Sequence, residues 1–263
     1  MDFNQFMHKK KVVLVGKDLQ DADIKGLADV LRESEVVEDI NLMCNRITFA
    51  DDTFTDALAQ NRTLKVLSLY NNQVGAEGAK RLAAAIKVNQ TLEQLLLEGN
   101  EIGDEGAKSL ADALMANQSI RVIILRGNKI GDEGAKHLAE CFLFNQSLRV
   151  VLLGDNKIGN EGAKCLVDHL PYGNMIDQLM VDNNNMSDIL EKKISTILSD
   201  PCRKDPHREK SLALPKYVVE KLLAHRDRVI QLKDKEIARV IKLKDKEIAA
   251  KDEERARVIK LKD

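Results

Sequence analysis

Residues 92–119 read LEQLLLEGNEIGDEGAKSLADALMANQS, and similar stretches precede and follow them. The period is 28 residues, as shown by the asparagines Asn72, Asn100, Asn128, Asn156 and Asn184. Such a period is typical of a solenoid, in which a unit too small to bury its own apolar face packs against the next copy. The chain is therefore predicted to fold as stacked repeats.

Each unit has two halves with different periods. Leu92, Leu95 and Leu97 lie on one side of a short strand by the period-two rule. Small and apolar residues from Ile102 to Leu114 then recur at helical spacing. The pattern predicts an α/β fold in which strands and helices share one core.

The recurring asparagine follows the strand, where a buried carboxamide can both donate to and accept from backbone groups. We expect a structural ladder formed by Asn45, Asn72, Asn100, Asn128, Asn156 and Asn184. In the first unit we expect Asp18 in the asparagine's place, after inward-facing Val13 and Val15.

Polar residues beside the helices are assigned to helix ends. Gly103 suits a turn with positive φ, and Asp104 is expected to cap its own helix, as are Asp132 and Asn160. Ala76 cannot do so, and the helix from Glu77 should therefore start less firmly. At the other end we expect left-handed asparagines to stop the helices, at Asn89, Asn117 and Asn145.

Three regions follow from these patterns. About seven units make residues 1–200 a solenoid, and residues 201–214 read as a polar linker with Pro201 and Pro206. Residues 215–263 lack internal glycine and proline and predict one long amphipathic, coiled-coil-like helix.

The strand motif LxxLxLxxN followed by IGDEGAKxLA resembles the leucine-rich repeat of ribonuclease-inhibitor type. This repeat also occurs in NLR receptors, in the Ran GTPase-activating protein and in tropomodulin-like proteins. The resemblance covers most of residues 10–200 and is most specific from Leu64 to Pro171. It implies a horseshoe with parallel strands on the concave side, helices on the convex side, and ligands held on the concave face or the rims.

Composition excludes several classes of function. The formal net charge is −1, so neither nucleic acid nor a membrane is expected as a partner. The chain shows no signal-peptide-like start and no membrane-spanning run, which predicts a cytoplasmic protein. No phosphate-binding loop or catalytic constellation is visible, and we expect no cofactor, no metal site and no enzyme activity. The His137/Cys141 and Cys165/His169 pairs are too few to indicate a metal.

The candidate site comes from strand alternation, because residues between the inward leucines must point outward. One outward row forms an apolar ridge, which we define as Leu96, Ile124, Leu152 and Met180. Exposed apolar surface often marks a contact site, although β propensity alone can also place such residues on parallel strands. The predicted partner-binding residues are Val66, Tyr70, Leu96, Glu98, Val122, Ile124, Arg126, Val150, Leu152, Met180 and Asp182.

The C-terminal segment contains the 11-residue repeat RVIQLKDKEIA at 228–238 and RVIKLKDKEIA at 239–249. An apolar line for helix association is formed by Ile230, Ile237, Ile241 and Ile248. The helix could self-associate, lie along another protein or the solenoid, or remain a solvated charged helix.

Together these features predict a non-catalytic scaffold that binds a protein partner on the concave face. Two alternatives come from the resemblance: a GTPase-activating regulator and an actin or cytoskeletal regulator. The Ran-activating family carries an acidic tail, from which the basic-leaning tail of this chain departs.

Overall fold

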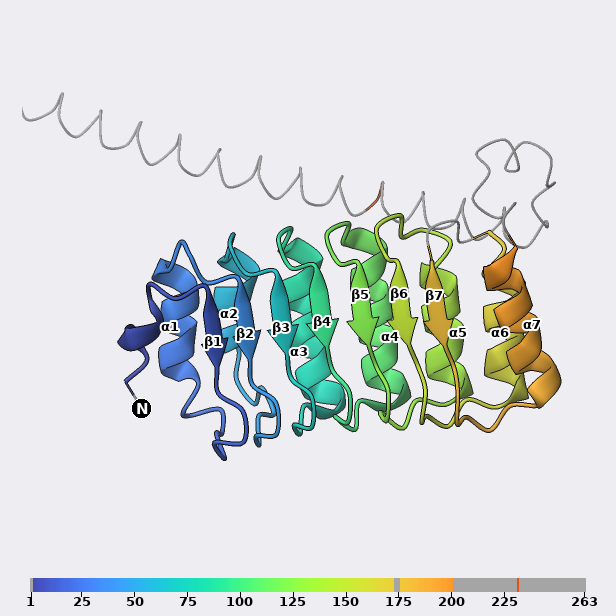
Figure 1. Ribbon diagram of the computed structural model, residues 1–263, viewed down its shortest axis with the longest axis horizontal. Helices are drawn as coiled ribbons and strands as arrows, with labels where there is room; N and C mark the ends of the chain where they lie inside the picture. Colours follow the sequence, from blue (N-terminus) through green and yellow to red (C-terminus); the bar gives the residue numbers. More distant parts are fainter. Residues whose placement is uncertain (1, 173–175, 201–230, 232–263) are drawn as a thin grey trace, which may run out of the picture. The chain divides into compact units, whose positions relative to one another are not determined.

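The computed structural model describes residues 2–172, 176–200 and 231. Figure 1 shows parallel strands side by side in chain order, with helices behind them. The seven strands are β1 (Lys11–Val13), β2 (Asp39–Asn41), β3 (Val66–Ser68), β4 (Gln94–Leu96), β5 (Val122–Ile124), β6 (Val150–Leu152) and β7 (Gln178–Met180). The α-helices are α1 (Lys25–Glu33), α2 (Thr53–Gln60), α3 (Gly75–Val88), α4 (Gly103–Ala116), α5 (Asp132–Cys141), α6 (Asn160–His169) and α7 (Asp188–Ser199), and a short 3-10 helix, η1 (Asn4–Phe6), precedes them.

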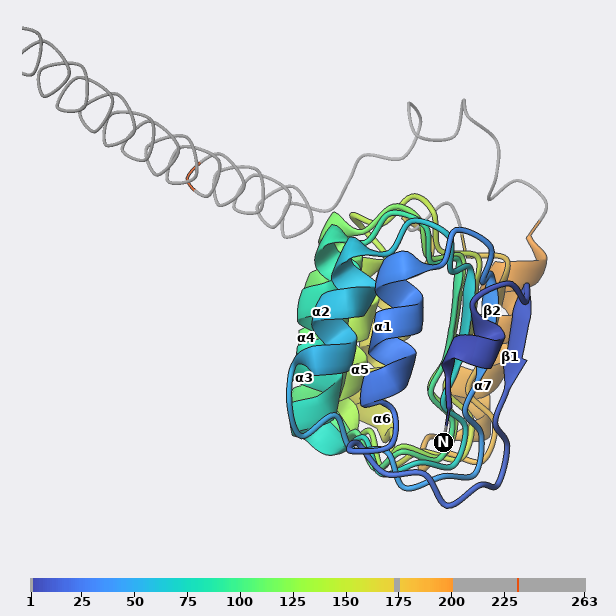
Figure 2. The same cartoon turned by 90° about the vertical axis from the view of Figure 1, so that its left-hand side faces the viewer.

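The strands and α1–α6 form two layers, which separate clearly when the solenoid is viewed from its end (Figure 2). Neighbouring strands pair in register, so that Leu67, Leu95, Ile123 and Val151 lie in one row. This order and register confirm the predicted α/β leucine-rich-repeat solenoid of about seven strand-helix units.

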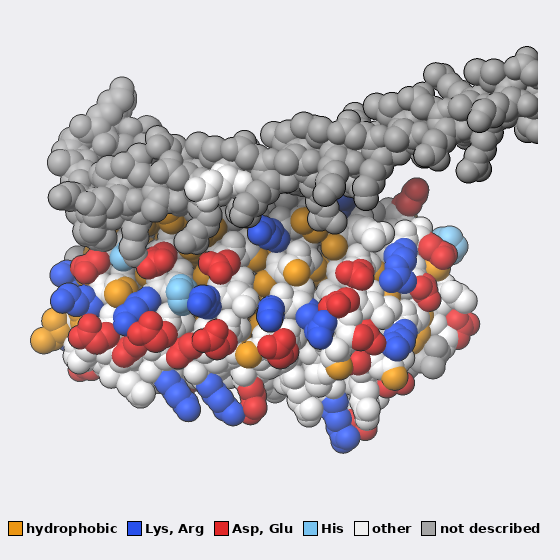
Figure 3. Space-filling view, turned by 180° about the vertical axis from the view of Figure 1, so that it is seen from behind, with side chains coloured by type: hydrophobic (Ala, Val, Ile, Leu, Met, Phe, Trp, Pro, Cys, Tyr) orange, Lys and Arg blue, Asp and Glu red, His pale blue; other side chains and the backbone are white. Residues whose placement is uncertain are grey.

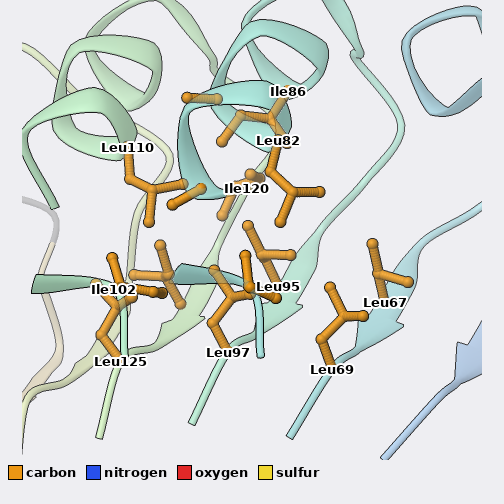
Figure 4. Packing of buried hydrophobic residues seen from close by; sticks show 14 of the residues in the cluster. Leu67, Leu69, Leu82, Ile86, Leu95, Leu97, Ile102, Leu110, Ile120 and Leu125 are labelled. Atoms are coloured by element: carbon orange, nitrogen blue, oxygen red, sulfur yellow. The ribbon is translucent and has the colours of Figure 1, made fainter. Parts of the chain in front are cut away.

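The core lies between the two layers. Strand leucines such as Leu95 and Leu97 meet helix residues such as Leu82 and Leu110 (Figure 4), and all four are fully buried. Each layer therefore covers the apolar side of the other, and successive helices pack against their neighbours as the strands do.

The first unit differs from its prediction by one residue. Val12 pairs with Ile40 and is fully buried, whereas Val13 is 52% exposed. Leu14 is also buried and Val15 is exposed, so the predicted inward pair of Val13 and Val15 is wrong. The asparagine's place in this unit belongs to Lys17, which lies 28 residues before Asn45, and not to Asp18.

The last unit is atypical, as expected for the end of a solenoid. The α7 helix packs against α6 and β7 and buries Ile194, whereas Ile189 is 77% exposed. The linker 201–214, the helix 215–263 and the line Ile230, Ile237, Ile241 and Ile248 lie outside the described residues. Among the residues that the structure does describe, no helix is long and apolar enough to cross a membrane.

Candidate functional site

The sheet face turned away from the helices, here called the open face, carries the outward residues of every strand. Along β4, β5 and β6 the central residue is buried and its two neighbours are half-buried. Period-two alternation produces this difference, because successive side chains point to opposite sides of a strand. The open face thus presents the side chains that do not enter the core.

The apolar ridge runs across four of these strands. Strand pairing aligns Leu96 with Ile124, Ile124 with Leu152, and Leu152 with Met180. The first three are half-buried and Met180 is 44% exposed, so the ridge is not part of the sealed core. Val122 and Val150 are half-buried in the adjacent row and widen it, whereas Val66 lies further along that row on β3.

The helix face of the solenoid has a different character. Lys, Arg, Asp and Glu side chains are intermixed over the surface seen in Figure 3, with apolar side chains scattered among them. A charged, mixed surface of this kind is ordinary for a soluble protein. The apolar row therefore distinguishes the open face from the opposite side of the same solenoid.

A charged cluster borders the ridge at the carboxyl ends of β4–β7. Arg126 forms ion pairs with Asp182 at 3.1 Å, with Glu98 at 3.9 Å and with Asp155. Desolvation lowers the pKa of Arg126, but the hydrogen bond to Asp155 and the attraction of the carboxylates outweigh it and raise the pKa. Because three carboxylates surround one guanidinium, the cluster is net negative. We name these four residues the acidic cluster, and Asp155 is the member that sequence reasoning did not select.

The recurring asparagines tie each repeat to the one before it. The Asn128 side chain donates to the Leu97 carbonyl at 2.8 Å and accepts from the amide of Asn100 at 2.9 Å. The Asn156 side chain repeats this with Leu125 and Asn128. Side-chain bonds to the preceding repeat are also made by Asn45, Asn72, Asn100 and Asn184. Buried polar groups that are paired in this way hold the strand ends in a common register.

A second row of asparagines runs along the opposite rim, where sequence reasoning predicted left-handed helix ends. The prediction of a left-handed conformation is wrong, because Asn89 and Asn117 have φ of −70° and −83° and are extended. The Asn117 side chain donates to the Asn89 and Ile86 carbonyls and accepts from the Ile120 amide. Asn61 and Asn145 make the corresponding bonds. Asn61, Asn89 and Asn117 directly follow the last residue of a helix, whereas Asn145 lies beyond the end of α5 at Cys141. All four bridge repeats, and their own 28-residue spacing was the available signal.

The aspartates at the helix starts also act between repeats. Asp104 accepts hydrogen bonds from the amides of Gly131 and Gly134 in the next repeat, at 2.7 and 2.9 Å. Its own helix, α4, has no side-chain cap. Asp132 likewise bonds to the next repeat, as Asn160 does to Ser187. The predicted self-capping is therefore wrong.

The expectation that the helix containing Glu77 starts less firmly than its neighbours stays a prediction. Ala76 holds the position of Asp104 one repeat earlier, so it offers no carboxylate to the start of α4, and it lies within the helix that contains Glu77. That helix, α3, starts at Gly75, before Glu77.

The histidine and cysteine pairs lie within the helices α5 (His137 and Cys141) and α6 (Cys165 and His169). No group of three or more candidate ligands comes together among the residues that the structure describes. The Nδ1 atom of His169 lies 2.8 Å from the Cys165 carbonyl oxygen, which is a bond within one helix. Burial raises the pKa of the Cys141 thiol, which favours the neutral form that neither attacks nor ligates well.

Comparison with known families gives a match to the leucine-rich repeat at residues 60–83, 88–111, 116–139 and 144–167. Each matched segment begins 28 residues after the previous one, which is the period of the asparagines. The matched family is defined by a structural repeat and not by a catalytic domain.

Solved structures that resemble the chain have low sequence identity to it. Leiomodin-1 actin-binding site 2 is 20% identical, covers 52% of this chain and 78% of its own, and has a TM-score of 0.45. The tropomodulin C-terminal domain of Caenorhabditis elegans is 17% identical, with coverage of 59% and 93% and a TM-score of 0.46. A pollen receptor kinase 3 is 17% identical, with coverage of 68% and 75% and a TM-score of 0.41.

Proposed function

Since this chain is a leucine-rich repeat protein, we propose that it is a non-catalytic scaffold whose open sheet face binds a protein partner. The partner covers the apolar ridge and meets the acidic cluster at its border. Val66, Tyr70, Val122 and Val150 complete the contact surface.

The alignment of the ridge on four neighbouring strands is the observation that supports this proposal. Leu96, Ile124 and Leu152 lie side by side on a face that no described helix covers. A row of partly exposed large apolar side chains gains free energy when a partner removes it from water, at about 25 cal/mol per Å2. The charged helix face offers no comparable row.

The test is affinity capture with the full chain and with the Leu96→Asp/Ile124→Asp variant. The carboxylates should remove partner capture, because each would have to be desolvated beneath the partner. A matched control is Val88→Asp/Ile189→Asp, which places the same charges on exposed apolar residues at 55% and 77% exposure outside the sheet. Circular dichroism and thermal unfolding of all three proteins would establish that the fold is retained.

Retained capture by the folded ridge variant would exclude this surface as the binding site. Partners that the wild type and the control capture but the ridge variant does not are the specific ones. The two alternative activities need their own measurements, which are cosedimentation with filamentous actin and GTP hydrolysis by small GTPases. A positive result that survives the ridge substitutions would assign the activity to another surface.

The proposal for the C-terminal segment rests on its sequence alone. Residues 215–263 carry Ile230, Ile237, Ile241 and Ile248 at spacings that favour helix association. We propose that this segment is a separate unit after a linker at 201–214, and that it joins the scaffold to a second copy or another helix. Light scattering with Ile237→Asp/Ile241→Asp tests this, since a self-associating protein would become monomeric.

A further inference from the structure

The apolar surface of the open face extends beyond the ridge onto the first three strands. Beside the ridge row lies a row that contains Val15, Met43 and Tyr70. Backbone bonds continue the strand pairing through this row, from the Gly16 amide to the Met43 carbonyl and from the Cys44 amide to the Tyr70 carbonyl. None of the three is buried, and Val15 is 39% exposed. The apolar surface therefore reaches β1.

The two apolar segments join obliquely between β3 and β4. Ser68, which pairs with Leu96, is only 5% exposed and breaks the ridge row. Tyr70 lies two residues after Ser68, just past the end of β3 and on the same face, and stands diagonally next to Leu96. Apolar side chains thus form one band that runs past the carboxyl ends of β1–β3 and across β4–β7, which we call the apolar band: Val15, Met43, Tyr70, Leu96, Ile124, Leu152 and Met180.

The repeat distance of the band matches a helix better than an extended peptide. Neighbouring strands are about 4.8 Å apart, whereas residues on one face of an extended ligand recur about every 6.7 Å. A helix brings its apolar stripe back about every 5.4 Å. Over the six strand spacings of the band the mismatch is about 4 Å for the helix and about 11 Å for the extended peptide. A helix that runs across the strands can follow the band.

The acidic cluster determines the charge of one flank of that ligand. Glu98, Arg126 and Asp182 lie two residues beyond Leu96, Ile124 and Met180 on their strands. The cluster therefore borders only the β4–β7 half of the band. Its excess of carboxylates is complementary to lysine or arginine on the facing side of the ligand.

We infer that the partner contributes one amphipathic helix that lies along the whole apolar band, with basic residues on the flank over the acidic cluster. This inference rests on the proposed function and adds the form, direction and charge of the ligand. Six strand spacings correspond to about 29 Å, or about 19 helical residues. The ridge alone would accommodate only about 10 residues.

The test uses fluorescein-labelled, lactam-bridged helical peptides and measures fluorescence anisotropy with the full chain. The probes are a leucine-striped helix of about 19 residues with a lysine flank, its glutamate-flanked counterpart, and a lysine-flanked helix of about 10 residues. We expect the long basic peptide to bind at least tenfold more tightly than the acidic one. Glu98→Gln/Asp182→Asn should reduce that preference to less than about threefold.

Substitutions at the β1–β3 end test the length of the contact. Met43→Asp should weaken the long basic peptide about tenfold and leave the short peptide unchanged. Val15→Asp serves as a second, more exposed variant if Met43→Asp unfolds, and Val88→Asp is the control that should change neither affinity. Equal loss for both peptides, or no loss for either, would overturn the contact along the whole apolar band.

Two further results separate this inference from the proposed function. If no helical peptide binds while the ridge variant still loses its captured partner, the helix is excluded and the open-face function stands. If the peptides bind but the ridge substitutions have no effect on peptide or partner, both proposals fail.

Discussion

The starts of α3 and α4 differ from those of α5 and α6, although the repeats have nearly the same sequence. Gly75 and Gly103 have φ of 60° and 63°, and their amides donate to main-chain carbonyls of the next repeat. Gly131 and Gly159 have φ of −102° and −91°, and their amides donate to an aspartate of the preceding repeat. The first two helices have 14 residues and the second two have 10.

The difference originates one repeat earlier in the chain. Asp104 and Asp132 precede α5 and α6, whereas the corresponding residue before α4 is Ala76. Without a carboxylate to accept its amide, Gly103 adopts the left-handed conformation and bonds to Asn128 instead. Local structure in this solenoid thus depends on the neighbouring unit as well as on the unit's own sequence.

Removing both aspartates, which distinguish α5 and α6 from α3 and α4, should have the largest effect on stability. Asp104→Ala/Asp132→Ala deprives two amides of each of α5 and α6 of their acceptor, and should lower the free energy of unfolding by about 3 kcal/mol. Urea unfolding followed by circular dichroism measures the change. The Asp104→Asn/Asp132→Asn protein keeps an acceptor oxygen and should lose less. Wild-type stability of the alanine variant would show that the caps contribute nothing.

Replacing one glycine of each kind with alanine should lower the free energy of unfolding by less than the loss of both aspartates, and by different amounts at the two positions. Gly103→Ala places a side chain at φ 63° with nothing within 4 Å of its Cβ, and should cost about 1–2 kcal/mol from backbone strain alone. Gly131→Ala keeps an ordinary φ, and its Cβ would lie 3.2 Å from an Asp104 oxygen. The loss at Gly131 should therefore be the smaller of the two. Denaturant midpoints of the single variants test this order, and the reverse order would contradict the conformational assignment.

The smallest effect is expected at the first junction, where Asp21 accepts from the amides of Thr48, Phe49 and Ala50. Desolvation raises the pKa of Asp21, but the Thr48 and backbone hydrogen bonds together lower it below 3.8. A lowered folded-state pKa contributes stability above the unfolded-state pKa, and this is lost as the pH falls through the folded-state value.

Asp21→Asn should therefore reduce stability more at about pH 7 than at about pH 2.5. Urea unfolding of both proteins at the two pH values provides the measurement. If the loss of stability in Asp21→Asn is the same at both pH values, the charge of the carboxylate does not contribute to stability.

The 28-residue period was sufficient to predict the fold, because strand and helix periodicities alternate within every unit. It also identified the outward positions of β3–β7, since the inward leucines of those units are unambiguous. In the first unit four apolar residues, Val12 to Val15, follow one another. Alternation cannot choose a face in such a run, and pairing with β2 decides it.

Interactions between repeats limited what the sequence could predict. A residue that recurs every 28 positions can bond within its own unit or to the neighbouring one, and the spacing is the same in both cases. The cap by Asp104 was therefore assigned to the wrong helix. A single row of the repeat pattern does not contain the oblique step from Tyr70 to Leu96, because that step joins two neighbouring rows of the sheet.

The direction of these bonds sets the order in which partners emerge from the ribosome. Asp104 is synthesised 27 residues before Gly131, so a nascent α5 finds its acceptor already made. The Asn100 amide, in contrast, bonds to the Asn128 side chain, which is translated 28 residues later. The units that contain α5 and α6 are thus capped by residues made before them, whereas the asparagine bonds of each strand end wait for the repeat that follows.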